Sequence, residues 1–332
     1  MLATTAREAA RRFGPRVVVD APDGRLTYAE LDAAADRLAV SLGALGVRRG
    51  DAVALVLPSG GDWMVAAVAV DRAGGVVCGI SPRLAPAERA ALVGVVRPAL
   101  VLTTAELVDG LPLRTSVALV APGSRGADVA ADIGDGGAAP PPDPDPDDPD
   151  RVALVCCTSG TTGRPKGATF RVAQLRAIAE IDLGPDWEQR WDGGAPMLAS
   201  TEFAHVGMVG KFPWYLRLGC TLVVMDRWRA EDALRLVATH RMPTVGVVAP
   251  QLALMLRSPV AEEVDLSAVT TVIAGGAASP PGLVEAARRR LGCHYSVRYS
   301  STESGGVGLA TPAGTDDDPR STTTVGRPRP GV

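Results

Sequence analysis

Short apolar runs alternate with helical patterns along this chain of 332 residues, and the alternation restricts its fold more than any other feature. The runs at 52–57, 76–80, 221–225, 245–248 and 269–274 are too short for helices and contain few polar residues. Segments 63–73, 230–240, 251–256 and 282–291 have helical periodicity. A strand that is buried on both faces reads as a continuous apolar run, and helices then cover both faces of its sheet. The pattern therefore predicts an α/β fold with parallel, doubly wound sheets.

A segment rich in Gly, Pro and Asp, residues 134–149, interrupts this alternation. Such a composition does not form a packed helix or strand and is typical of a connector. We therefore expect two α/β subdomains, over residues 1–150 and 151–332. In the first, Thr27 and Glu30 have the spacing of a capping box, which predicts a helix that starts there and ends at Gly46.

Charge and composition exclude several classes of protein. The formal net charge of −3 provides no basic surface for nucleic acid, and no apolar run approaches the roughly 18 residues of a membrane-spanning helix. The first residues lack the basic and then apolar order of a secretory signal. Five cysteines at unpatterned spacings, two of them adjacent, argue against a disulfide framework and favour a reducing compartment. We expect a cytoplasmic protein.

A stretch rich in Gly and Thr, TSGTTGRPKG at 158–167, directly follows the apolar run 152–157. Glycines let the backbone approach an anion closely, and successive hydroxyl and amide donors form a concavity for phosphate oxygens. Lys166 is one of only two lysines in a chain that otherwise uses arginine, which favours a requirement for a compact ammonium. The stretch is not a Walker A sequence, because Gly167 stands where Ser or Thr follows the lysine. It is either a phosphate-binding loop or a flexible surface turn.

This stretch resembles the signature of the adenylate-forming superfamily, which includes acyl-CoA and aryl-CoA synthetases, luciferases and nonribosomal peptide adenylation domains. The resemblance extends over nearly the whole chain, in the family's order. Its other blocks are LTYAEL at 26–31, GVRRGD at 46–51, FAHVG at 203–207, GGAA at 275–278, YSSTE at 299–303 and VGRPRPG at 325–331. The resemblance implies the N-terminal domain of an AMP-forming ligase, with ATP or AMP and Mg²⁺ as cofactors.

The phosphates of ATP are assigned by this resemblance to the loop at 158–167. The residues implied are Thr158, Ser159, Gly160, Thr161, Thr162, Gly163 and Lys166. Thr302 would hydrogen-bond a phosphate. Glu303 is the magnesium candidate, because a lone carboxylate beside hydroxyls, completed by phosphates and water, suits Mg²⁺ and does not suit zinc. The alternative for Glu303 is an exposed residue of a polar turn.

Two further segments are expected to bind the nucleotide. The ring of Tyr299 would stack on adenine, with Ser300 and Ser301 beside it. Small residues where a strand ends leave room for a flat base, at the place where open α/β sheets bind ligands. These residues are Gly275, Gly276, Ala277 and Ala278.

The acid is expected to bind near the segment that follows Phe203. By resemblance His205 neighbours the substrate carboxylate and acts in catalysis with the phosphate-binding groups; otherwise it is a structural histidine at the head of a helix. Lys211 could meet an anionic substrate or lie solvated on a helix face. The family usually has glycine where this chain has Ser300, so we expect Ser300 to contact the acid. The remaining pocket candidates are Gly207, Met208, Trp214, Ala274 and Gly275.

Together these features predict ATP-dependent activation of a carboxylic acid to an acyl-adenylate with release of pyrophosphate, followed by thioester formation with CoA. The acceptor could instead be a carrier protein, and a non-catalytic nucleotide-binding module is a different alternative. By resemblance, amino-acid-activating members carry an Asp before the aromatic–His element, where it pairs with the substrate ammonium. This chain has no clear equivalent there, only Glu202, which favours an aryl, fatty or polycyclic acid. A hydrolase is disfavoured because there is no Gly-x-Ser-x-Gly elbow, and a zinc enzyme because the three histidines are isolated.

By resemblance, a ribose-binding Asp, a β-rich subdomain and a small C-terminal domain would follow Val332. We therefore expect this chain to be the nucleotide- and acid-binding core of a longer enzyme. A site without its closing domain stays open to water, so we expect the chain alone to turn over poorly.

Overall fold

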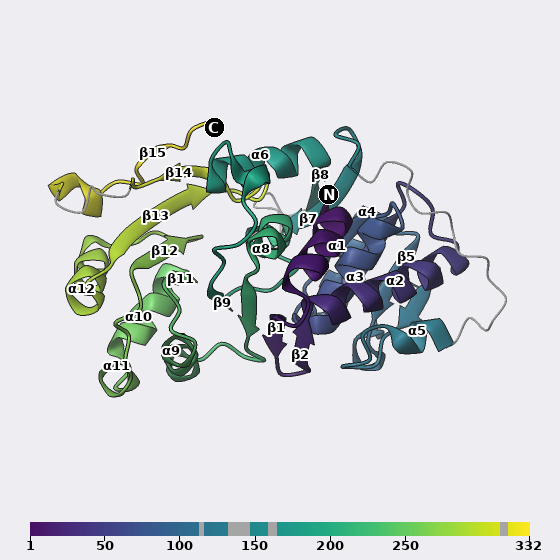
Figure 1. Cartoon of the computed structure of the whole chain (residues 1–332), viewed down its shortest axis with the longest axis horizontal. Helices are drawn as coiled ribbons and strands as arrows, with labels where there is room; N and C mark the ends of the chain where they lie inside the picture. The colour runs from purple at the N-terminus through teal and green to yellow at the C-terminus, as the bar shows by residue number, and fades with distance from the viewer. Residues whose placement is uncertain (113–115, 132–146, 159–164, 313–317) are drawn as a thin grey trace.

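The computed structural model describes residues 1–112, 116–131, 147–158, 165–312 and 318–332. These residues form an α/β structure with two sheet-and-helix halves (Figure 1). One half holds a six-stranded sheet, the other a five-stranded sheet, and a four-stranded sheet lies between them (Figure 1). The predicted fold class is confirmed.

The six-stranded sheet has the order β6-β5-β3-β4-β7-β8. Its strands are β3 (Ala52–Val56), β4 (Val76–Gly79), β5 (Leu100–Thr103), β6 (Val117–Leu119), β7 (Val152–Thr158) and β8 (Lys166–Arg171). The first five are parallel, and β8 runs antiparallel to β7. The helices of this half are α1 (Leu2–Phe13), α2 (Tyr28–Ala44), α3 (Gly61–Arg72), α4 (Pro86–Val96) and α5 (Ala127–Ala131).

Strand β3 shows why the apolar runs are continuous. Val53 and Leu55 belong to the large core that contains α3, whereas Ala54 and Val56 belong to a second cluster with residues of α4. All four side chains are fully buried. Because successive side chains of a strand point to opposite faces, both faces of this sheet are covered.

The four-stranded sheet has the order β2-β1-β10-β9 and joins distant parts of the chain. Its strands are β1 (Val17–Ala21), β2 (Gly24–Thr27), β9 (Pro196–Ala199) and β10 (Thr221–Val224). Val19 of β1 is paired in parallel with Leu222 of β10. Strand pairing also links β7 to β4, so hydrogen bonds cross the expected boundary at residue 150 twice. The division into two domains there stays a prediction.

The five-stranded sheet has the order β11-β12-β13-β14-β15. Its parallel strands are β11 (Thr244–Val247), β12 (Thr271–Gly275) and β13 (His294–Ser300), and its antiparallel strands are β14 (Gly308–Ala310) and β15 (Arg327–Pro328). The helices α9 (Ala230–Thr239), α10 (Ala249–Arg257), α11 (Val260–Glu263) and α12 (Pro281–Leu291) lie beside it (Figure 1). Its core is separate from the larger one.

Most predicted elements are confirmed, with ends displaced by one or two residues. The capping box is present: the Glu30 amide donates to Thr27 Oγ1 at 3.2 Å, and the Thr27 amide donates to Glu30 Oε2 at 2.8 Å. The helix ends before Gly46, whose φ of +94° favours glycine. The predicted end of the phosphate loop is two residues too late, because Lys166 and Gly167 already pair with β7 as the start of β8.

All five cysteines lie in the described residues, and no disulfide joins any of them. Within the parts of the chain that the structure describes, no helix combines the length and apolar character needed to cross a bilayer.

Candidate active site

The hairpin of β7 and β8 holds the ends of the phosphate loop. Thr158, the last residue of β7, is paired with Lys166, the first residue of β8, and the Lys166 side chain is exposed. Strand β7 leaves the sheet at its carboxyl edge, where ligands bind in folds of this kind. Five of the predicted phosphate contacts lie outside the described residues: Ser159, Gly160, Thr161, Thr162 and Gly163.

The predicted Thr302 and Glu303 lie in a tight turn that follows β13. Reciprocal hydrogen bonds close it: the Ser301 amide donates to Ser304 Oγ at 3.1 Å, and the Ser304 amide donates to Ser301 Oγ at 3.2 Å. The Gly306 amide donates to the Ser301 carbonyl at 3.1 Å. The turn is therefore held by its own hydroxyls and backbone, and the Glu303 carboxylate stays exposed.

Two glycines bring this turn against other predicted site segments. Gly305 has a φ of +71°, and a Cβ there would lie 2.2 Å from Ile178 Cδ1 on α6 (Val172–Leu183) and 3.4 Å from the Phe170 ring on β8. A Cβ on Gly306 would lie 3.8 Å from the Gly207 Cα. The turn with Glu303 thus packs on the β8–α6 segment that leaves the phosphate loop, and on the segment of His205.

His205 is the N-cap residue of the short helix α7 (Val206–Val209). Its Nδ1 accepts a hydrogen bond from the Gly207 amide at 3.1 Å, which assigns the proton of the neutral ring to Nε2. Loss of hydration lowers the pKa of this imidazole, and the nearby Glu202 carboxylate opposes the shift. His205 is therefore neutral at pH 7, with an exposed side chain that can donate from Nε2.

An aromatic cluster fixes the segment in front of His205. The rings of Trp63, Phe203 and Phe212 meet edge to face, with centroids 5.0 to 5.8 Å apart, and all three are fully buried. Edge-to-face packing orients each ring in a specific way. The Phe203 amide also donates to Ser59 Oγ at 2.9 Å. His205 lies two residues after Phe203, so this cluster holds the backbone that leads to it in a fixed position.

The adenine-side turn begins at the end of β12. Gly275 is paired with Arg298 of β13, so this turn lies beside the strand end that carries Tyr299, Ser300 and Ser301. Gly276 has a φ of +73°, and it is exposed together with Ala277 and Ala278. Tyr299 is 63% exposed, with its ring open to a ligand. Ala274 differs, because its side chain is fully buried in the core, and only its backbone could face an acid.

Lys211 lies just before α8 (Phe212–Leu218), and its side chain is only 12% exposed, so it is not a solvated residue of a helix face. Its ammonium lies 2.8 Å from Asp182 Oδ2, and 5.8 Å from the centroid of the Trp214 ring. Met208 is buried and Trp214 is half-buried. The sequence offered no sign of Asp182, because its partners come from distant segments.

A cavity of about 460 Å³, which the sequence reasoning missed, opens where β3, β5, β9 and β10 end. Five carboxylates and two guanidinium groups line it: Asp23, Asp62, Glu106, Glu202, Asp226, Arg83 and Arg227. None of the predicted site residues does so. The rule that open α/β sheets bind ligands at their carboxyl edge could have indicated it.

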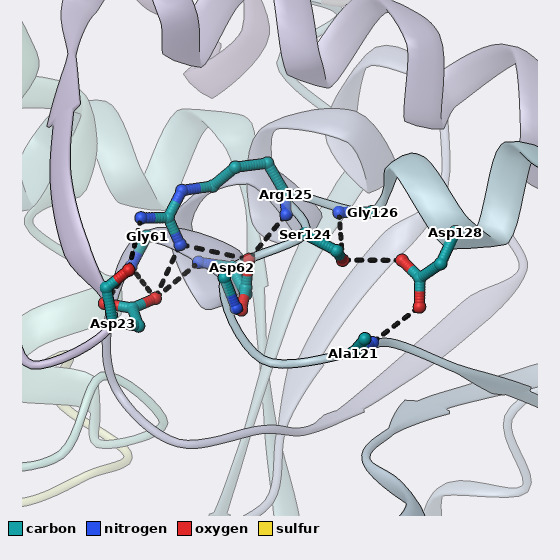
Figure 2. Close-up of polar contacts among 9 residues, drawn as sticks. Asp23, Gly61, Asp62, Ala121, Ser124, Arg125, Gly126 and Asp128 are labelled. Atoms are coloured by element: carbon teal, nitrogen blue, oxygen red, sulfur yellow. Dashed lines mark hydrogen bonds and ion pairs between the residues drawn. The ribbon is translucent and has the colours of Figure 1, made fainter.

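Figure 2 shows how two of these carboxylates are held. The Arg125 guanidinium donates to Asp23 at 2.6 Å and to Asp62 at 3.1 Å, and the Asp62 carboxylate also accepts from the Gly123 amide at 2.6 Å. The Gly61 amide at the start of α3 donates to Asp23 at 3.1 Å. These bonds fasten the β1–β2 hairpin to α3 and to the loop at 121–126.

The fold and the assembled segments define a class of nucleotide-dependent enzymes. Residues 6–332 match the family of AMP-binding enzymes, and the chain belongs to this family. The resemblance inferred from the sequence is confirmed.

The chain is similar to several CoA ligases. It is 28% identical over 317 residues to 4-coumarate–CoA ligase 1 of Oryza sativa subsp. japonica, a match that spans 88% of this chain and 55% of that protein. It is also 28% identical over 292 residues to an indoleacetate–CoA ligase of Aromatoleum aromaticum, with 85% of this chain and 56% of the relative covered. The chain thus spans little more than half the length of these relatives.

A solved structure of similar shape is the N-terminal domain of FACL13 from Mycobacterium tuberculosis. Its TM-score is 0.83 at 25% identity, over 99% of this chain and 82% of that one. This agreement supports the fold of an adenylate-forming N-terminal domain.

Proposed function

We propose that this chain supplies the nucleotide- and acid-binding core of an enzyme that activates a carboxylic acid as its acyl-adenylate and passes the acyl group to CoA. The observation that carries the proposal is the convergence of three segments. The turn with Glu303 packs on Ile178 of α6, the helix that follows β8, and on Gly207, two residues after His205. This packing supports the proposal that the phosphate, metal and carboxylate ligands act at one place.

In the proposed reaction the substrate carboxylate attacks the α-phosphorus of ATP and pyrophosphate leaves. Two anions must approach each other, so positive charge and hydrogen-bond donors have to be in place beforehand. Lys166 and the loop hydroxyls hold the leaving phosphates, and Thr302 donates to a phosphate oxygen. His205, neutral and with its proton on Nε2, orients the substrate carboxylate.

Glu303 fits a magnesium site of the kind that nucleotide enzymes use. Among the described residues no three His, Cys, Asp or Glu side chains form a metal-binding group. Mg²⁺ bound through one carboxylate, phosphates and water needs no such group. When bound, the ion neutralises charge on the phosphates, and Glu303 holds it by one exposed carboxylate.

The test is formation of acyl-AMP from Mg·ATP and a panel of carboxylic acids, detected by mass spectrometry. We expect Glu303→Gln to lower the rate at least about tenfold, the usual effect of removing a group that stabilises the transition-state charge. Glu285→Gln, which changes an exposed carboxylate on α12, is the matched control and should leave the rate unchanged. Ser300→Gly should shift the preference among acids. An absence of acyl-AMP with every acid, together with normal nucleotide binding, would favour a non-catalytic module.

A carrier protein is the second candidate acceptor. The chain is 34% identical over 242 residues to the phosphinothricin tripeptide synthetase PhsC of Streptomyces viridochromogenes, which covers 72% of this chain and 21% of that protein. Supplying either CoA or a phosphopantetheinylated carrier protein to preformed acyl-AMP separates the two acceptors.

A further inference from the structure

Asp182, near the end of α6, is surrounded by three cations. Lys211 Nζ lies 2.8 Å from its Oδ2, an Arg298 nitrogen lies 3.0 Å from its Oδ1, and Arg329 also donates to Oδ1. The exposed fractions of the four side chains are 5% for Asp182, 12% for Lys211, 22% for Arg298 and 13% for Arg329. We call these four residues the Asp182 cluster.

The Asp182 cluster has an excess of two positive charges, since three cations share one carboxylate. The buried Arg89 guanidinium donates to backbone carbonyls, whereas two other poorly exposed cations each lie between two carboxylates. Arg72 lies between Asp32 and Asp36, and Arg125 lies between Asp23 and Asp62. An unbalanced charge that has lost much of its hydration is costly unless an anion or water compensates it.

The cluster also has unused hydrogen-bond donors. Among the described contacts, neither Arg298 Nε nor the indole nitrogen of Trp214 has a hydrogen-bond partner, although both atoms are buried. The Lys211 ammonium lies 5.8 Å from the centroid of the Trp214 ring. Asp182 Oδ2, a buried acceptor of the same cluster, also has no hydrogen-bond partner among the described contacts, although the Lys211 ammonium lies 2.8 Å from it. The hydrogen-bonding capacity of this cluster is therefore incompletely used.

The position of the cluster connects it with the candidate acid site. Arg298 directly precedes Tyr299 on β13, and it is paired with Gly275 of the adenine-side turn. Lys211 follows α7, whose N-cap is His205. Asp182 lies one helical turn after Ile178, the residue that Gly305 contacts. The cluster therefore borders the place where the three site segments meet.

We propose that the Asp182 cluster binds a second carboxylate of the substrate, so that the acid activated here is a dicarboxylic acid. The inference rests on the proposed function and specifies its substrate class. One carboxylate of the acid reacts near His205, and the other pairs with Lys211 and Arg298 at the cluster. Arginine and lysine are the usual partners of a buried carboxylate. A monocarboxylic acid with an uncharged aryl or alkyl body would leave the excess charge at the cluster uncompensated.

A purely structural role is the alternative, because Arg329 also donates to the Ile181 carbonyl at 2.6 Å and so fastens the last residues to α6. That role predicts that loss of a cation lowers stability alone. It predicts no change in the choice of acid.

The experiment measures binding of dicarboxylic acids of three to eight carbons and of their monomethyl esters, in the presence of AMP. The readouts are intrinsic tryptophan fluorescence, to which Trp214 contributes, and the thermal shift of unfolding. We expect at least one diacid to bind at least about tenfold more tightly than its monoester. Lys211→Met should remove this preference, and Lys211→Arg should keep part of it. Arg72→Met, which removes a cation of 9% exposure that the site does not use, should leave the preference intact.

The possible results distinguish a failure of the dicarboxylate inference from a failure of the proposed function. Equal binding of every diacid and its monoester would overturn the dicarboxylate inference, as would an unchanged preference in Lys211→Met. In either case AMP binding measured alongside would show whether the proposed function still stands. If Lys211→Met fails to fold, Arg298→Gln, which keeps a donor but loses the charge, gives the same comparison. Loss of AMP binding by the unaltered chain would instead count against the proposed function itself.

Discussion

At the scale of single residues, charge and hydration set two groups of the site to defined protonation states. Partial loss of hydration keeps His205 neutral, although the Glu202 carboxylate is close. Burial alone would raise the pKa of Asp182, but Lys211 and Arg298 outweigh it and lower the pKa to about 2. A neutral His205 can donate to the proposed substrate carboxylate, and an ionised Asp182 orders the cations around it.

The depressed pKa of Asp182 makes stability depend on pH in the acid range. An Asp with a folded-state pKa below its usual 3.8 stabilises the protein above that value, and the contribution is lost as pH falls toward 2. Its size is about 2 kcal/mol. We therefore expect the stability difference between the unaltered chain and Asp182→Asn to shrink between pH 6 and pH 2, as measured by urea unfolding. Asp186→Asn, at an exposed position, should show no such change. A constant difference across this range would show that Asp182 is not held as an anion by its partners.

At the scale of elements, the turn that follows β13 brings the segments of the proposed site together. The turn at 301–306 is closed by its own serines, and it fits against α6 only because residue 305 has no side chain. Through Gly306 the same turn also contacts the start of α7. Three elements that carry the proposed ligands thus meet through a close approach of backbone to side chain.

Gly305→Ala should separate this turn from α6. The substitution combines a positive φ of 71° with a Cβ placed 2.2 Å from Ile178 Cδ1. We expect it to cost about 1 kcal/mol for the backbone and roughly 1–3 kcal/mol more for overpacking. The matched control is Gly292→Ala, since Gly292 has a φ of +60° with no atom within 4 Å of the new Cβ, and should cost only the backbone part. Equal loss of stability in the two variants, measured by urea unfolding, would show that the contact with α6 is not tight.

At the scale of the whole molecule, the sequence predicted what local patterns determine. The buried strands, the capping box and the α/β class follow from apolar runs and short-range spacing, and the structure confirms them. Pairing between β1 and β10, about two hundred positions apart, had no local sign. The same is true of Asp182, whose cations lie just before α8, on β13 and in the last residues.

The most direct test of the central claim is a calorimetric titration of this chain with Mg·ATP. The claim is that the nucleotide's phosphates bind between the Lys166 loop and Glu303. We predict one binding site, weakened at least about tenfold by Lys166→Met, as expected for a lost charged hydrogen bond. Arg171→Met, which removes an exposed cation farther along the same strand β8, should bind ATP like the unaltered chain. No ATP binding at all, or equally tight binding by Lys166→Met, would contradict the account.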